Sequence, residues 1–277
     1  MLEETYANQI KAELLDIVQH NPIIYKYLSF ETGVLAITNL SVGFKSPWAF
    51  NDPYDFFEGL ICFENVPDGY REYLVDKYHP GFSEAEKKAK LAEFASVSDS
   101  VAIEYVKKNG MFNEVKNRGV SCFSRKYDHM LMWSHYAQSH RGICIGFNML
   151  QLYINVARYS GERMIALVNY VEEMEPVDYY YSNGEAILRW MKTKAAVWSY
   201  EEEIRIILNG LDYQGQENFI VNLDSDCFNS IYYGSMISNE NRTLLDILTA
   251  EKMPNVEIFQ MERQSNSFLL KASPIRD

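Results

Sequence analysis

Alternation of apolar and polar side chains along the chain predicts short strands separated by helices. Strands are predicted at residues 23–30, 40–45, 121–124, 142–148, 164–171, 201–208, 219–223, 230–236 and 256–263, and the period of two typical of strands is used to assign the faces of 23–30 and 201–208. Helical spacing of apolar residues occurs at residues 3–20, 129–139, 185–196 and 241–251. This mixture predicts one α+β domain over residues 1–277, with a mixed, mainly antiparallel sheet as its core.

Residues 67–118 interrupt this pattern, because they are charged and favour helix. Ser83 and Glu86 have the spacing of a capping box, in which each side chain bonds the other's backbone N–H. We therefore expect a helical insertion that covers one edge of the sheet.

Net charge and cysteine spacing argue against several classes of protein. The 38 acidic and 26 basic residues give a net charge of −12, which argues against broad binding to nucleic acid or anionic membranes. The four cysteines form no CxxC pair, so neither a common zinc site nor a disulfide framework is expected. The chain opens on acidic and polar residues rather than a signal peptide, and no apolar run approaches the roughly 20 residues that span a bilayer. A cytoplasmic protein without a membrane partner is expected.

The strand at residues 201–208 carries the first candidate site. Alternation places Glu201, Glu203 and Arg205 on one face and Glu202 on the other, with Trp198 just before the strand. One interpretation is a water-facing surface with a weak ion pair. The other is the wall of a site, where a carboxylate orients a hydroxyl group or stabilises developing positive charge.

Lys26 is unusual because it lies between the apolar residues Ile24 and Leu28 on one face of the strand at residues 23–30. A buried lysine needs a partner or a role. The alternative is an edge strand from which Lys26 reaches solvent.

The helix at residues 129–139 brings histidines close to this region. Asp128 is the expected N-cap. His135 and His140 lie about 140° apart around a helix, so they cannot form the i, i+4 zinc pair of a metalloprotease. Each is expected to be a hydrogen-bonded structural histidine, with His135 at a potential pocket edge. Gly142 and Gly146 in the next strand would allow close approach of another backbone or a ligand.

A metal site has one further candidate, because Asp52, Asp55 and Glu58 are spaced by three residues. Acidic residues beside a turn more often cap a helix, and we expect no metal here. The sequence also lacks a dinucleotide-binding GxGxxG after a strand, a Walker loop, HExxH and a GxSxG elbow.

Several short motifs together resemble the bacterial family called domain of unknown function 2971. In order, they are IYKY at Ile24–Tyr27, FNDPYD at Phe50–Asp55, CFS at Cys122–Ser124, MWSHYAQSHRGICIGF at Met132–Phe147 and WSYEEEIRI at Trp198–Ile206.

The layout of these elements is also similar, more distantly, to the ADP-ribosyltransferase superfamily. Lys26 would take the place of a basic residue on an early strand, Phe123, Ser124 and Tyr136 that of a second element, and Glu201-x-Glu203 that of a late carboxylate pair. This resemblance implies that NAD is the substrate and that Glu203 bonds its ribose and stabilises the oxocarbenium-like transition state. The implied catalytic residues are Glu203, Glu201, Lys26 and His135, and those implied to bind NAD are Tyr25, Tyr27, Ser124, Tyr136, Arg205 and Trp198.

The first hypothesis is thus an ADP-ribosyltransferase-like enzyme or NAD glycohydrolase, acting as a toxin or phage-defence effector. Its partner would be a small-molecule nucleotide or a macromolecular acceptor. The alternative is a non-catalytic domain that binds a nucleotide or a partner. A third hypothesis is a hydrolase that uses Cys122 or His135.

Overall fold

The computed structural model describes residues 12, 14–64, 68–95, 98–106, 116–180, 183–213 and 216–275. The chain divides into two compact units. Unit 1 comprises Met1–Asn51, Asn117–Glu172 and Lys194–Asp277, and unit 2 comprises Asp52–Lys116 and Glu173–Thr193.

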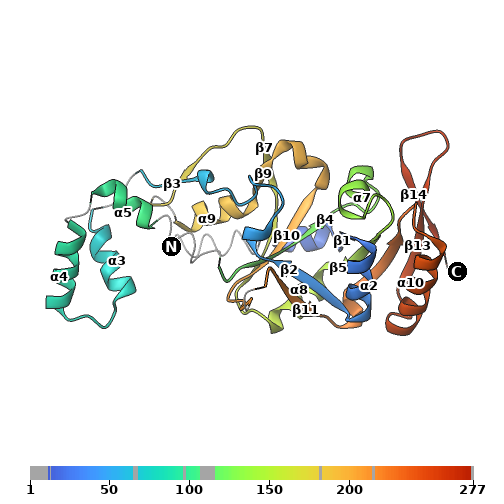
Figure 1. The fold of residues 1–277 in the computed structure, drawn as a ribbon, viewed down its shortest axis with the longest axis horizontal. Coiled ribbons are helices and arrows are strands. Elements are labelled where there is room, and N and C mark those ends of the chain that lie inside the picture. The colour runs from blue at the N-terminus through green and yellow to red at the C-terminus, as the bar shows by residue number, and fades with distance from the viewer. Residues whose placement is uncertain are drawn as a thin grey trace. The chain divides into compact units, whose positions relative to one another are not determined.

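Unit 1 is organised around a 10-stranded sheet in which eight strands follow the order β11-β2-β4-β1-β5-β12-β13-β14, while β10 and β6 extend from β4 (Figure 1). The strands are β1 (Ile23–Leu28), β2 (Ser41–Lys45), β4 (Gly119–Ser124), β5 (Ile143–Asn148), β6 (Arg163–Leu167), β10 (Glu203–Leu208), β11 (Asn218–Asn222), β12 (Phe228–Tyr233), β13 (Glu257–Arg263) and β14 (Leu270–Pro274). All pairs are antiparallel except β12 with β13. Two short strands, β7 (Asn169–Val171) and β9 (Thr193–Ala195), pair separately.

Strand β4 is the branch point of this sheet. Along one edge, all six of its residues pair with β10. Among the described residues, β2 and β1 meet the other edge only at its ends, where Val120 lies opposite Lys45 and Ser124 lies opposite Tyr25. The two neighbouring strands therefore diverge along the middle of β4.

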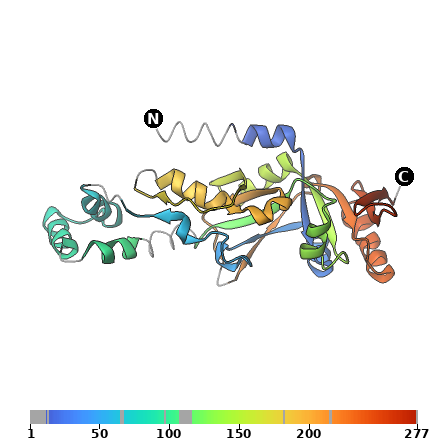
Figure 2. The same ribbon diagram turned by 90° about the horizontal axis from the view of Figure 1, so that it is seen from above.

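One face of the sheet forms the main core. Ile24, Phe123, Ile145 and Ile231 point into it because they occupy alternate positions on their strands. Figures 1 and 2 show α2 beside α10 at one end of unit 1. The helical segments of unit 1 are residues 14–20, α2 (Phe30–Thr38), η1 (Pro47–Ala49), α7 (Met130–Tyr136), α8 (Met149–Asn155), η4 (Val156–Arg158), η5 (Ala196–Glu201), η6 (Ser225–Cys227) and α10 (Asn239–Lys252).

The opposite face is aromatic and is covered by α7. Trp133 of α7 is fully buried and meets the ring of Tyr27 edge-on at 5.3 Å between centroids. Tyr127 stacks on Tyr232 at 4.4 Å, and Tyr232 stacks on Phe259 at 5.0 Å. This second cluster holds α7 against β1, β5 and β12.

Unit 2 contains α3 (Tyr70–Tyr78), α4 (Glu84–Ala95), α5 (Asp99–Val106), α9 (Asn183–Lys192) and η2 (Glu58–Leu60), with β3 (Ile61–Cys62) parallel to β8 (Val177–Asp178). The predicted capping box precedes α4 and is confirmed, since the Ser83 N–H donates to Glu86 Oε2 at 2.7 Å and the Glu86 N–H donates to Ser83 Oγ at 3.4 Å. The single domain and the bounds of the 67–118 insertion stay predictions.

The predicted fold class is confirmed, because the chain is mixed, with a mainly antiparallel open sheet. The predicted strand at 164–171 is in fact two strands, and the helix expected at 185–196 ends at Lys192 so that Lys194 lies in β9. Strand β14 was not expected. The first predicted helix is confirmed at residues 14–20, where Ile17 is fully buried, and its earlier part lies outside the described residues except at residue 12.

Two expectations about α7 were wrong. Its N-cap is His129 rather than Asp128, and the helix ends at Tyr136 instead of Ser139. It ends early because Gln138, Ser139 and His140 all have left-handed backbone, with φ of 50°, 52° and 67°. The close approach expected at Gly142 is confirmed, since a Cβ there would lie 2.1 Å from the carbonyl oxygen of Leu28.

Candidate functional site

Strands β4 and β10 bring polar side chains to the aromatic side of the sheet. Ser124 lies opposite Glu203 and Cys122 lies opposite Arg205. Residues directly opposite each other in an antiparallel pair project from the same face. Tyr25 of β1 lies opposite Ser124, so one row of side chains crosses three strands from Tyr25 to Glu203.

Glu201 joins this row through an irregular backbone. It ends η5, and Glu202 then adopts a left-handed conformation with φ of 43° and ψ of 54°. The expectation of a strand from Glu201 was therefore wrong, because β10 begins at Glu203. The Glu202 side chain is half-buried and forms ion pairs with Arg125 and Lys126.

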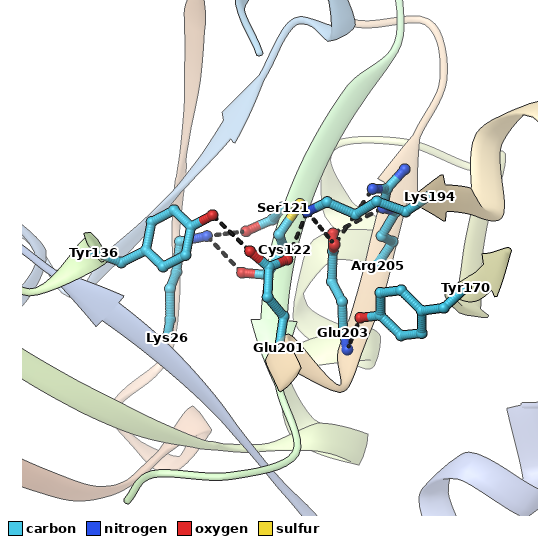
Figure 3. Close-up of polar contacts among 9 residues, drawn as sticks. All are labelled: Lys26, Ser121, Cys122, Tyr136, Tyr170, Lys194, Glu201, Glu203 and Arg205. Atoms are coloured by element: carbon cyan, nitrogen blue, oxygen red, sulfur yellow. Dashed lines mark hydrogen bonds and ion pairs between the residues drawn. The ribbon is translucent and has the colours of Figure 1, made fainter. Parts of the chain in front are cut away.

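Lys194 connects the two carboxylates. Its Nζ lies 2.5 Å from Glu201 Oε2 and 3.1 Å from Glu203 Oε2 (Figure 3). The three side chains are only 8%, 5% and 3% exposed, respectively. Charge-assisted hydrogen bonds between buried groups are strong, so Lys194 fixes the spacing of the pair.

Arg205 holds the far side of Glu203. Its Nε donates to Glu203 Oε1 at 2.8 Å and a terminal nitrogen donates to Oε2 at 3.3 Å. Arg205 is fully buried. We call Lys194, Glu201, Glu203 and Arg205 the carboxylate network.

Two tyrosines complete the hydrogen bonds of the carboxylate network. The Tyr136 hydroxyl group donates to Glu201 Oε1 at 2.6 Å, and the Tyr170 hydroxyl group accepts from the Glu203 backbone N–H at 2.8 Å (Figure 3). Tyr136 is the last residue of α7, and therefore the packing of Trp133 also positions Tyr136.

The two glutamates have opposite electrostatic shifts. Burial raises the pKa of Glu203, but Arg205 and Lys194 together outweigh burial and hold the pKa below its ordinary value. Burial also raises the pKa of Glu201, and there the attraction of Lys194 and the hydrogen bond from Tyr136 do not overcome it. Environments that push two pKa values apart mark candidates for an acid–base division of labour.

Lys26 lies beside this network without joining it. Its Nζ donates to Ser121 Oγ at 3.0 Å and to the Cys122 carbonyl oxygen at 2.9 Å. Ser121 and Cys122 belong to the part of β4 from which β1 diverges. The ammonium group of Lys26 therefore supplies hydrogen bonds to β4 where the β1 backbone is not paired with it. The edge-strand alternative was wrong, because β1 lies between β4 and β5.

The other candidates lie at different distances from the carboxylate network. Trp198 covers Lys194, with 5.2 Å from Nζ to the ring centroid. Ser124 is buried, and its Oγ accepts from the Lys126 N–H. Tyr27 donates instead to the Lys126 carbonyl oxygen. His135 is exposed and faces the ring of Tyr200 at 6.3 Å.

The hydrolase hypothesis loses its support at Cys122. Burial raises the pKa of the Cys122 thiol well above its ordinary value. A nucleophilic cysteine needs the opposite shift, because the thiolate is the reactive form. His140 is a hydrogen-bonded histidine as expected, with Nε2 3.1 Å from Ser134 Oγ.

Sequence reasoning missed Lys194 and Tyr170. Residues 185–196 were expected to form a helix, but Lys194 is buried in β9. The available signal was a lysine directly before the apolar run Ala195–Trp198 and seven residues before Glu201.

The backbone at Glu202 leads to a stability prediction. Replacing Glu202 by glycine removes exposed ion pairs worth about 0–1 kcal/mol each but favours the left-handed conformation. We expect the free energy of unfolding in urea to change by less than about 1 kcal/mol. Glu202→Val loses the same ion pairs and resists this conformation, so it should be less stable than Glu202→Gly by about 1–2 kcal/mol. Equal stability of the two variants would show that the backbone is not strained.

The family comparison covers the segment that builds most of this site. Residues 132–206 match the family model described as a protein of unknown function, DUF2971. The DUF2971 segment includes Tyr136, Tyr170 and the whole carboxylate network. The predicted family is confirmed, while the motifs at residues 24–27, 50–55 and 122–124 lie outside the match and the ADP-ribosyltransferase resemblance stays a prediction.

Neither curated proteins nor solved structures returned a match to the chain. Within the described ranges, no cluster of three or more His, Cys, Asp and Glu side chains is arranged to bind a metal ion. No helix in those ranges has the length and apolar character needed to cross a membrane.

Proposed function

We propose that the chain is an enzyme that cleaves the nicotinamide–ribose bond of NAD, with a site like that of an ADP-ribosyltransferase. The observation that carries this proposal is the Glu201–Glu203 pair, in which one carboxylate is held ionised and the other has a raised pKa. The tyrosines along β1 and at the end of α7 would supply flat surfaces for the nicotinamide ring.

In the proposed reaction, the bond between the ribose C1′ and the nicotinamide nitrogen breaks and its electron pair leaves with nicotinamide. Positive charge then develops on the ribose, and the ionised Glu203 stabilises it. A hydroxyl oxygen from water or an acceptor forms the new bond to C1′. Its proton passes to Glu201, because a raised pKa makes a carboxylate a better base near neutral pH.

The test is nicotinamide release from NAD at equal folded concentrations of wild type, Glu203→Gln and Glu202→Gln. We expect Glu203→Gln to lower the rate by about 10²–10³-fold, since it removes charge stabilisation of the transition state. Glu202→Gln should match the wild type, because the ion pairs of Glu202 in the described part of the chain are with the partly exposed Arg125 and Lys126. Turnover that survives in Glu203→Gln would end this assignment.

A second candidate function is nucleotide binding without turnover. Both oxygens of Glu203 already bond cations, and both glutamates are 4% exposed, which favours a rigid recognition site over a reactive one. A rise in melting temperature with NAD but no nicotinamide release would select this function, because a ligand that binds only the folded protein stabilises it. Neither release nor stabilisation would remove both candidates.

A further inference from the structure

We infer that Lys194 is a positioning residue that bridges the buried Glu201 and Glu203, favours the ionised form of Glu201 and thereby prepares Glu201 to accept a proton. Its catalytic consequence rests on the proposed function, whereas its effect on Glu201 does not.

The geometry singles out Lys194 among the nearby cations. Only its Nζ bonds both carboxylates, at 2.5 Å to Glu201 and 3.1 Å to Glu203, among the contacts described around the pair. Of the two glutamates, Arg205 bonds Glu203. Lys26 donates instead to Ser121 and Cys122. Removing Lys194 would therefore change both glutamates at once.

The position of Lys194 is built into the fold. The backbone turns from β9 into η5, and η5 returns the chain to β10 so that Glu201 comes back to Lys194. The Lys194 side chain is 8% exposed, and Trp198 lies over its Nζ at 5.2 Å. A lysine held this way cannot exchange its partners for water without moving η5.

Glu201 depends on the positive charge of Lys194 more than Glu203 does, because the other partners of the two carboxylates differ. Glu203 has a second cation, Arg205, while Glu201 has the neutral Tyr136 hydroxyl group. Lys194 is thus the one cation bonded to Glu201 among the described residues. The described groups that interact electrostatically with the pair are Lys194, Arg205, Lys26, Tyr136, Tyr170, Tyr200 and Cys122.

The sign of the expected change follows from this arrangement. A neighbouring cation favours the ionised carboxylate and lowers its pKa. Lys194 already opposes the upward effect of burial on the pKa of Glu201. Without Lys194, Glu201 would hold its proton to higher pH and would be a protonated acid where the proposed reaction needs a base.

The experiment follows Glu201 without any substrate. Infrared difference spectra across a pH titration separate protonated carboxyl groups from carboxylates, and Glu201→Gln identifies the Glu201 band. In the wild type, we expect this band to titrate above the ordinary range of a glutamate. In Lys194→Met, the midpoint should rise by about 1–3 pH units, the effect of losing one adjacent opposite charge.

Matched variants distinguish the role of Lys194 from general disturbance. Lys194→Arg keeps the charge and should restore most of the wild-type midpoint. Lys26→Met removes a partly buried lysine whose described hydrogen bonds go to Ser121 and Cys122 and whose electrostatic effect falls on Glu203, so it should move the Glu201 midpoint much less. Lys194→Gln keeps a donor without charge and serves if Lys194→Met fails to fold.

Three results would overturn the inference: a wild-type spectrum without a Glu201 band above the ordinary range, an unchanged midpoint in Lys194→Met or Lys194→Gln, or an equal shift in Lys26→Met. None depends on NAD, so they are separable from failure of the proposed function. If NAD is cleaved, the acidic limb of the kcat–pH profile should move with the infrared midpoint, while KM changes less.

Discussion

Replacement of Arg205 by methionine is expected to destabilise the protein by about 3–5 kcal/mol, the usual cost of leaving a buried charge without its partner. Arg205 is fully buried, and its guanidinium group bonds both oxygens of Glu203. Its loss leaves Glu203 with Lys194 as its remaining bonded cation among the described residues. The measurement is the free energy of unfolding from urea denaturation followed by circular dichroism.

Two further variants make this result specific. Arg125→Met breaks an ion pair whose side chains are 41% and 24% exposed, and it should cost only about 0–1 kcal/mol. The double variant Arg205→Met/Glu203→Gln should recover part of the lost stability, because the buried carboxylate that lost its Arg205 partner is replaced by a neutral amide. A loss at Arg205 no larger than that at Arg125 would mean that water reaches the carboxylate network.

Replacement of Trp133 by alanine should cost about 3–5 kcal/mol, as expected for emptying a buried aromatic site. Trp133 is fully buried, its indole N–H donates to the Tyr127 carbonyl oxygen at 2.8 Å, and its ring contacts Tyr27. Because Trp133 anchors the helix that ends at Tyr136, the hydrogen bond to Glu201 should weaken as well. Urea denaturation measures the first effect, and the midpoint of the Glu201 infrared band measures the second.

The control is Trp48→Ala, which removes a tryptophan that is 60% exposed and should cost less than about 1 kcal/mol. A similar loss for both tryptophans would contradict the anchoring of α7. An unchanged Glu201 band in Trp133→Ala would show that Tyr136 keeps its place without the core beneath α7.

The parts of the fold that follow from local pattern were predictable. Strands such as β1, β5 and β10 are runs of β-branched and aromatic residues buried in a sheet, and the capping box before α4 is purely local. Strand β14 was missed because Leu270–Pro274 is short, contains no β-branched or aromatic residue and ends in proline. Its place is decided by pairing with β13.

Left-handed backbone at non-glycine residues was the main source of error. Nothing local in His140 or Glu202 demands a positive φ, which L-residues rarely adopt. At His140 the conformation is held from outside, because its N–H donates to Trp133 and its carbonyl oxygen accepts from Met236. The early end of α7 and the delayed start of β10 both follow from such distant contacts.

The candidate site was predictable where strand periodicity applied. Glu203 and Arg205 share a face of β10 as alternation requires, and Tyr136 reaches Glu201 because α7 packs on the same side of the sheet. Lys194 was missed because its partnership depends on the path through β9 and η5. Lys26 illustrates the reverse: its unusual position was visible, but its partners depended on how β1 diverges from β4.

The branching of the sheet at β4 has a consequence for synthesis of the chain. Lys26 and Ser121 are 95 residues apart, and β10 follows β4 only after β5, α8 and β6 have been made. Until residue 208 leaves the ribosome, one edge of β4 has no strand to pair with, although five of its six residues are destined for burial. Unpaired apolar edges favour aggregation, so a stalled or truncated chain ending before β10 is the species on which chaperones would be expected to act.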